Sequence, residues 1–560
     1  MWGILFQKYV FVQYLYRYKQ KFIKITFNDE SSACKTQDFV SQNSCEIKAS
    51  EQLQKYYKFA AANGYAQEKR RNEENMSRIL ENLEPADVLR YFEEICAIPH
   101  GSGNMQAISS YVVDFAKNHS LQYRRDDSLN VIIWKPASAG YENRPVVMLQ
   151  GHMDMVEAKE DWSDHDFATQ GLDLFVEGEY LGARGTTLGG DDGIAVAYML
   201  AILADETLPH PALECVFTVD EETGLLGAAA LDLSDCKASY LLNLDSEEEG
   251  IFLSSCAGGM RVELTLPVQR KEEQGNLYQI TVDGLLGGHS GMEIQKERAN
   301  ANLLLARVLR ELQWSVDLEW SLVSLSGGEA DNAIPRKCSA VIVSPAEEAF
   351  VAAALQAVSA PIFAEYKIAD PDITIQVQSQ GSGSVEAMTP VTMGKVFFLL
   401  NQCPNGVQNM SQAIEGLIET SLNLGILSTT EEEVKAAFSV RSSVESRKFA
   451  LHDRLEFLIE FLGGSSTFYG DYPGWDYKVD SKLRTLMVDL WNQMYEDQPA
   501  KVEAIHAGVE CGLILYQMPD LDIISLGPDM KDIHTPQERL SLASVKRVYE
   551  YVKEVLRVLQ

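Results

Sequence analysis

Short apolar runs alternate with helical stretches along the chain after residue 76. Residues 193–205 are apolar on all sides and predict a buried helix, and residues 76–92 place apolar side chains at helical spacing. Apolar runs of four to seven residues, which are typical of strands, lie at 131–134, 146–149, 213–219 and 239–244. This alternation predicts an α/β domain with a mainly parallel central sheet.

The pattern changes over residues 261–472, which we predict to be an inserted lid domain. A weak internal repeat occurs there at a spacing of about 100 residues, because SLVSLSGG begins at 321 and SLNLGIL at 421. Each of these strands leads into a second strand and then a helix, so we predict a duplicated α+β unit. The α/β pattern resumes after the insertion. The α/β domain is therefore predicted to comprise residues 76–260 and 473–560.

Residues 1–75 differ from the rest of the chain in charge and pattern. They hold 12 Lys and Arg against 8 Asp and Glu, whereas the remaining 485 residues carry a net charge of −37. No amphipathic period runs through the segment, so we expect an N-terminal extension that packs poorly. A further hypothesis is that the native chain begins at Met76 and that residues 1–75 are not part of it.

Composition limits the partners and the compartment of the protein. The net charge of −33 disfavours binding to nucleic acid or to an anionic membrane surface. No apolar run reaches the ~18 residues that span a bilayer. The nine cysteines form no CxxC pair, which is typical of a reducing compartment. We therefore expect a cytoplasmic protein with no nucleic-acid partner and no membrane association.

Ionisable side chains follow several of the predicted strands. His152 and Asp154 come directly after the run at 146–149, and residues two apart in an extended chain face the same side. The carboxyl ends of strands in an open α/β sheet are where functional groups gather. Further candidates follow other strands or lie in a glycine-rich turn before a helix: Glu221 and Glu222, Asp245, His534, and Asp191 with Asp192.

This set of side chains predicts a hydrolytic metal site. Two His with Asp and Glu, and no Cys, suit Zn²⁺ or a similar divalent ion. About five ligands allow two ions to share one bridging carboxylate. One member of the Glu221–Glu222 pair can bind metal while its neighbour activates water, and Asp154 is placed to orient His152.

A series of motifs in the same order along residues 80–560 carries a resemblance to a known family. The motifs are GHMDMV, ARGTTLGGDDGI, DEETGLLGA, NLDSEEEG, CAGG, GGHSG, NAIPR, PNGV, ETSLNLG, YPGW and HAGVECG. The chain resembles the di-zinc superfamily of aminoacylases, carboxypeptidases and dipeptidases. Within it, the chain is most similar to the bacterial aminoacyl-histidine dipeptidases, also called Xaa-His or β-alanyl-histidine dipeptidases.

The resemblance implies a role for each candidate at the metal centre. His152 and Asp245 would hold one ion, Glu222 and His534 the other, and Asp191 would bridge the two. The implied ions are zinc, with cobalt or manganese as alternatives. One departure is Asp192, where some relatives have Asn. Another is Gln537, where an acidic residue is common, which leaves the surroundings of His534 open.

The resemblance also implies the residues that act on the substrate. Glu221 would be the general base that takes a proton from the metal-bridging water and passes it to the leaving amine. Asp154 would hold His152 in place. From the lid, His289 would stabilise the oxyanion. Asn332 and Arg441 would bind the substrate backbone or its terminal carboxylate.

These observations favour a metal-dependent dipeptidase that cleaves short peptides, Xaa-His dipeptides among them. The metal site alone leaves open an N-acyl amino acid deacylase or a carboxypeptidase on the same scaffold. A lid of about 210 residues favours the dipeptidase, because such a lid can close the site and contact both ends of a dipeptide. A third interpretation is a non-enzymatic metal-binding protein that has lost its activity. The presence of Glu221, the expected base, argues against this interpretation. A homodimer is left open.

Overall fold

The computed structural model describes residues 28–29, 32–33, 78–315 and 317–559. The chain divides into two compact units, with the boundary in the sequence between Ser77 and Arg78. In the first unit, β1 (Asn28–Asp29) and β2 (Ser32–Ala33) pair antiparallel. Apart from these two strands, the predictions about residues 1–75 concern a segment outside the described residues. The second unit contains every candidate site residue.

An eight-stranded sheet is the centre of the α/β part of the second unit. Its strand order is β22-β10-β23-β9-β5-β8-β4-β3, and the neighbours from β23 to β8 run parallel. This confirms the predicted α/β fold with a mainly parallel sheet. The strands are β3 (Gln122–Arg125), β4 (Val131–Lys135), β5 (Val147–His152), β8 (Leu213–Thr218), β9 (Tyr240–Asn243), β10 (Ile251–Cys256), β22 (Lys501–Ile505) and β23 (Asp522–Ser525).

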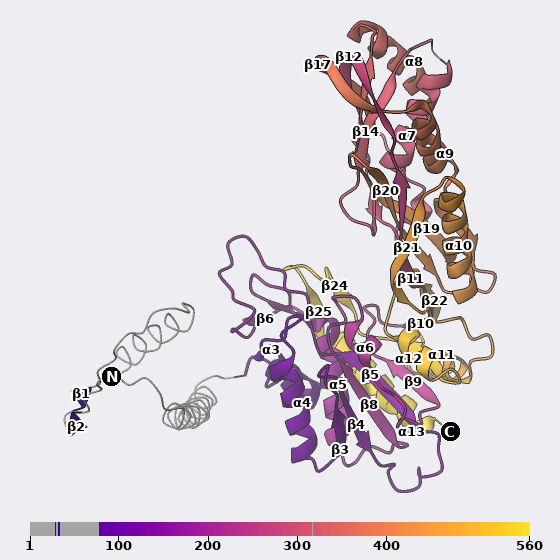
Figure 1. The fold of residues 1–560 in the computed structure, drawn as a ribbon. Coiled ribbons are helices and arrows are strands. Elements are labelled where there is room, and N and C mark those ends of the chain that lie inside the picture. Colours follow the sequence, from indigo (N-terminus) through magenta and orange to yellow (C-terminus); the bar gives the residue numbers. More distant parts are fainter. Residues whose placement is uncertain (1–27, 30–31, 34–77, 316, 560) are drawn as a thin grey trace, which may run out of the picture. The chain divides into compact units, whose positions relative to one another are not determined.

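Helices pack on both faces of this sheet, which is why β5 is buried along its whole length. Val147 and Leu149 belong to a large core on one face, whereas Met148 belongs to a smaller core on the other. The apolar helix α5 lies in the large core beside β5 (Figure 1). The helices of this part are α3 (Ala86–Cys96), α4 (Gln106–Asn118), α5 (Gly190–Ala204), α6 (Leu226–Ala230), α11 (Lys482–Met494), α12 (Cys511–Gln517) and α13 (Leu542–Val558).

A small four-stranded sheet brings the C-terminal segment to the glycine-rich turn before α5. Its order is β24-β25-β7-β6, with antiparallel pairs throughout. The loop between β24 and β25, residues 532–538, carries His534. The strands are β6 (Leu174–Glu177), β7 (Tyr180–Ala183), β24 (Met530–Lys531) and β25 (Arg539–Ser541).

The inserted segment forms a second, antiparallel sheet with its own hydrophobic core. Its order is β17-β12-β16-β14-β19-β20-β11-β21, and β18 pairs with β19. Figure 1 shows these strands, from magenta to orange, gathered apart from the parallel sheet. The strands are β11 (Gly258–Pro267), β12 (Arg270–Asp283), β14 (Ser321–Gly327), β16 (Cys338–Ser344), β17 (Thr374–Met388), β18 (Gly406–Met410), β19 (Ile418–Thr429), β20 (Glu433–Ser442) and β21 (Ser465–Tyr472).

The helices of the insertion follow the order expected from the repeat. The strand pair β14 and β16 is followed by α8 (Glu348–Tyr366), and the pair β19 and β20 is followed by α10 (Glu445–Phe461). The insertion also contains α7 (Ala301–Ser315) and α9 (Pro390–Gln402). By length and composition alone α8 could cross a membrane, but it packs on α7 and β17 and buries Leu355 and Ile362 in the core.

Candidate functional site

His152 is the last residue of β5, and its imidazole is held by the segment that follows. Its Nδ1 lies 3.0 Å from the backbone oxygen of Asp154 and 3.5 Å from Asp154 Oδ1. Asp154 in turn accepts hydrogen bonds from Ser102 Oγ at 2.8 Å, from the backbone N–H of Glu221 at 3.0 Å and from that of Glu222 at 3.3 Å. One buried carboxylate therefore connects the end of β5 to the turn after β8, and it directs His152 Nε2 away from itself.

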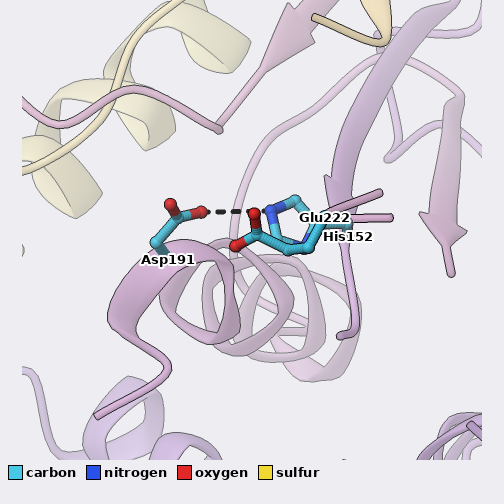
Figure 2. A group of neighbouring side chains, drawn as sticks. All are labelled: His152, Asp191 and Glu222. Carbon is cyan, nitrogen blue, oxygen red and sulfur yellow. Dashed lines mark hydrogen bonds and ion pairs between the residues drawn. The ribbon is translucent and has the colours of Figure 1, made fainter. Parts of the chain in front are cut away.

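Asp191 lies between the two candidate imidazoles. Its Oδ1 is 3.0 Å from His152 Nε2, and its Oδ2 is 3.1 Å from His534 Nε2. Glu222 Oε1 is 2.9 Å from the same His534 nitrogen, and Asp245 Oδ1 is 3.8 Å from His152 Nε2. Figure 2 shows the His152 ring directed at the Asp191 carboxylate, with Glu222 alongside. The structure thus brings all five predicted ligands together around one shared carboxylate.

The turn before α5 gives Asp191 its unusual position. Gly189 has φ 68°, in the left-handed region that glycine adopts without strain, and Asp191 and Asp192 depart from helical φ/ψ values inside the first turn of α5. His534 also has a positive φ, 61°, which is uncommon for a residue with a Cβ atom. Such backbone conformations cluster at functional sites, where the surrounding structure holds them in place.

The electrostatics of the five side chains are those of a strongly acidic cluster. Contacts with Asp191 and then Glu222 raise the pKa of His534 to about 11, against the opposing effect of burial. Burial disfavours the charged form of Asp191, but hydrogen bonds with the two imidazoles outweigh it and lower its pKa. Burial also raises the pKa of Asp245 well above its ordinary value, with repulsion from neighbouring carboxylates adding to the effect and His152 opposing it.

These donors fit divalent cations better than they fit protons. An imidazole Nε2 carries at most one proton, yet that of His534 faces two carboxylate oxygens and that of His152 faces two others. Glu222 Oε1 is buried and lacks hydrogen-bond geometry despite its short approach to His534. Ligand atoms of His152, Asp191 and Glu222 all lie within 4.8 Å of one another. A nitrogen and carboxylate donor set of this kind suits zinc and related divalent ions.

Asp192 and Glu221 lie beside the five ligands. Asp192 Oδ2 accepts the backbone N–H of His152 at 3.1 Å, and its Oδ1 is buried with no partner among the residues that the structure describes. Glu221 is half-buried, and burial raises its pKa well above the ordinary value; Asp245, Glu510 and Glu222 act in the same direction and His152 in the opposite one. A carboxylate with a raised pKa is able to hold a proton, as a general base must.

The predicted lid residues gather in a second cluster. His289 lies in β13 (Gly288–His289), which pairs with β15 (Ala333–Ile334), and Ser290 N donates to Asn332 O at 2.8 Å. Arg441 is 9% exposed, and its Nη1 donates to Tyr472 Oη at 3.3 Å. Its Nε is buried and has no partner in the described part of the chain. Among residues 78–315 and 317–559, no hydrogen bond or ion pair joins this cluster to the five metal-ligand candidates.

His506 belongs to the lid cluster. The sequence left open whether it shapes the substrate pocket or only packs, and did not assign it as a site residue. Its Nε2 is 2.7 Å from Ser421 Oγ on β19, and its Nδ1 is buried with no partner among residues 78–315 and 317–559. Burial, and then the charge of Arg441, lower the pKa of His506 to about 3, so the ring is neutral at physiological pH. The only sequence signal for it was its place in the HAGVECG motif.

Glu538 is the second residue that the sequence analysis missed. The acidic residue expected at position 537 is found one position later, because Gln537 is exposed and bonds to Glu160 whereas Glu538 is 2% exposed. Its carboxylate accepts backbone N–H groups from the turn before α5. Glu538 therefore provides a buried carboxylate in the loop that carries His534.

Comparisons with known proteins identify the family of the chain. The chain matches the model of peptidase family M20/M25/M40 over residues 148–558. It is 35% identical over 481 residues to the cytosol non-specific dipeptidase of Escherichia coli (strain K12). This match covers 85% of the present chain and 98% of the relative. The crystal structure of aminoacylhistidine dipeptidase from Vibrio alginolyticus superimposes with a TM-score of 0.80 at 34% identity, over 87% of this chain and 99% of that one. The resemblance found in the sequence is thus confirmed, and the chain belongs to peptidase family M20/M25/M40.

Proposed function

We propose that the protein is a metal-dependent dipeptidase that hydrolyses short peptides, Xaa-His dipeptides among them. The observation that carries the proposal is Asp191, whose two oxygens lie 3.0 and 3.1 Å from the imidazoles of His152 and His534. A single carboxylate placed between two such groups suits a pair of ions. The E. coli and V. alginolyticus relatives, named as dipeptidases, support the reaction class.

In this proposal His152 and Asp245 would hold one ion, Glu222 and His534 would hold the other, and Asp191 would be shared between them. Zinc is the proposed metal, with cobalt and manganese as alternatives that the same donors accept. When bound, such ions polarise a peptide carbonyl and lower the pKa of water toward neutrality.

The chain's own residues then move the proton and orient the donors. Glu221 accepts the proton of the attacking water and passes it to the amine of the departing residue, which its raised pKa favours. Asp154 keeps the His152 ring in one orientation, and it also fixes the backbone of Glu221 and Glu222. Asp154 therefore holds in place both the proposed base, Glu221, and the proposed ligands His152 and Glu222.

The lid cluster supplies recognition of the substrate in this proposal. Among the described residues, Arg441 Nε and His506 Nδ1 are buried nitrogens without partners, and an unsatisfied buried polar group is costly unless a ligand meets it. The terminal carboxylate of a dipeptide is the group that an arginine binds best. His289 is assigned to the oxyanion, and Asn332 to the substrate backbone.

A cytoplasmic location belongs to the same proposal. The seven described cysteines are free, as expected in a reducing compartment, and the E. coli relative is named as a cytosolic enzyme.

The decisive test is hydrolysis by the full chain, stripped of metal and reloaded with Zn²⁺. The panel holds β-alanyl-histidine, other Xaa-His and Xaa-Xaa dipeptides, a tripeptide and an N-acetyl amino acid. We expect metal-dependent cleavage of the dipeptides alone. Cleavage of the acetylated substrate alone would establish a deacylase and overturn the proposal, and cleavage that survives metal removal would overturn the role of the ions.

A further inference from the structure

Glu538 holds the glycine-rich turn that precedes α5, and it does so from the loop that carries His534. Its Oε2 accepts the backbone N–H groups of Leu188 at 2.8 Å and Gly189 at 3.1 Å. Its Oε1 accepts those of Gly190 at 2.8 Å and, more weakly, Asp191 at 3.4 Å. These four consecutive N–H groups all point at one buried carboxylate.

A carboxylate is the side chain that this place requires. The first N–H groups of a helix have no partner inside the helix, and α5 has no side-chain cap from its own N-cap residue, Gly189. The N-terminal end of a helix also favours negative charge. An ionised carboxylate accepts through both oxygens, whereas a glutamine would turn its NH₂ group toward two N–H donors.

The position of Glu538 along the chain gives this contact its consequence. His534 and Glu538 lie in the same loop, whose ends are fixed by the pairing of Met530 with Leu540 and of Lys531 with Arg539. In this loop, His534 Nε2 lies 3.1 Å from Asp191 Oδ2. Glu538 accepts hydrogen bonds from the backbone just before Asp191. The loop thus holds the Asp191 turn at two points.

We propose that Glu538 is a positioning residue that sets the placement of Asp191 relative to His534, and so tunes the affinity of the site for its second ion. The inference rests on the proposed metal-dependent function. Glu538 is not offered as a ligand, because both of its oxygens are already occupied by backbone N–H groups. Residues that orient metal ligands in this way typically change metal affinity about 10- to 100-fold when they are replaced.

The experiment compares Glu538→Gln with a matched control, Asp522→Asn. Asp522 is also buried, and it also accepts N–H groups at the start of a helix, those of Lys482 at 2.9 Å and Leu483 at 3.1 Å. It lies at the end of β23 opposite to the strand ends that carry the site. Both variants are expected to lower the Tm of the metal-free protein, because each loses a helix cap.

Zn²⁺ binding separates positioning from simple capping. Competition with a chromogenic chelator should show one of the two equivalents bound about 10- to 100-fold more weakly in Glu538→Gln, and wild-type binding in Asp522→Asn. The rise in Tm on adding Zn²⁺ should shrink in Glu538→Gln alone. Wild-type affinity for both equivalents in Glu538→Gln, or equal weakening in the two variants, would overturn the inference. A wild-type chain that binds no Zn²⁺ would overturn the proposed function as well.

A second variant tests the same contact from the other side. A Cβ atom at Gly190 would lie 3.1 Å from Glu538 Oε1, so Gly190→Ala should displace the carboxylate without removing its charge. If Glu538→Gln does not fold, Gly190→Ala decides the matter. Weaker binding of one Zn²⁺ equivalent supports the inference, and unchanged binding overturns it.

Discussion

Replacing Arg441 by Met should abolish any preference for substrates that end in a free carboxylate. Arg441 is 9% exposed, and the Nε–H of its guanidinium has no partner among the described residues. The contact of Nη1 with the Tyr472 hydroxyl is long, at 3.3 Å. The group is therefore largely desolvated before substrate binds, and a carboxylate meets N–H donors that little else satisfies.

The size of the effect follows from these contacts. A hydrogen bond to a charged group contributes about 1.5–3 kcal/mol, so two such bonds from the guanidinium contribute about 3–6 kcal/mol. Because about 1.4 kcal/mol corresponds to a factor of ten, kcat/KM on an Xaa-His dipeptide should fall about 10²- to 10⁴-fold. Most of the loss should be in KM, since the carboxylate is bound both before and during the reaction.

The assay is a cycle of two enzymes and two substrates, an Xaa-His dipeptide and its C-terminal amide. Arg441→Met should lose far more activity on the free acid than on the amide. Arg447→Met is the control, because Arg447 is a half-exposed lid arginine that pairs with Glu419, and such a pair contributes at most about 1 kcal/mol. If Arg441→Met kept the wild-type ratio between the two substrates, the carboxylate would bind elsewhere.

Four further results are expected. Glu221→Gln should lower kcat about 10²- to 10⁴-fold with normal Zn²⁺ content, as measured by turnover and by metal analysis; loss of the metal instead would make it a ligand. Asp154→Asn should weaken Zn²⁺ binding about 10- to 100-fold in chelator competition, and unchanged binding would contradict its role. Removing the metal should abolish hydrolysis and lower Tm by on the order of 5 °C in a thermal scan. Below its unfolded pKa of 6.5, His506 binds a proton only on unfolding, down to its folded pKa of about 3. The free energy of unfolding should therefore fall as pH drops through that window, and His506→Gln should flatten this slope in denaturant titrations.

The strand ends explain why much of the site was accessible from the sequence. Parallel strands share one carboxyl edge, so residues that follow β5, β8 and β9 are expected to meet there whatever the details of packing. His152 ends β5, Glu222 and Asp245 follow β8 and β9, and the structure brings all three around Asp191. The mainly parallel sheet could also be predicted, because short apolar runs and helical stretches alternate along the chain.

Contacts between segments far apart in the sequence could not be predicted in this way. Glu538 meets N–H groups nearly 350 positions earlier in the chain, and no periodicity encodes that distance. His506 meets Ser421 across the junction between the α/β part and the insertion. The family motif around each residue marked the segment, but only the fold shows which neighbouring side chain is buried and what it contacts.

Asp154 and Glu538 make the same kind of contact at two places in the candidate site. Each is a buried carboxylate that accepts backbone N–H groups from a segment bearing functional residues, and each lies within four positions of a histidine that faces Asp191. Asp154 connects His152 to the turn of Glu221 and Glu222, and Glu538 connects the His534 loop to the Asp191 turn. Because a bond to backbone fixes a segment and not merely a side chain, the ligands are held at their spacing before any ion arrives. The repulsion among the acidic side chains is then opposed by the fold itself, and ions bound at the proposed site would gain affinity because little of it has to reorganise.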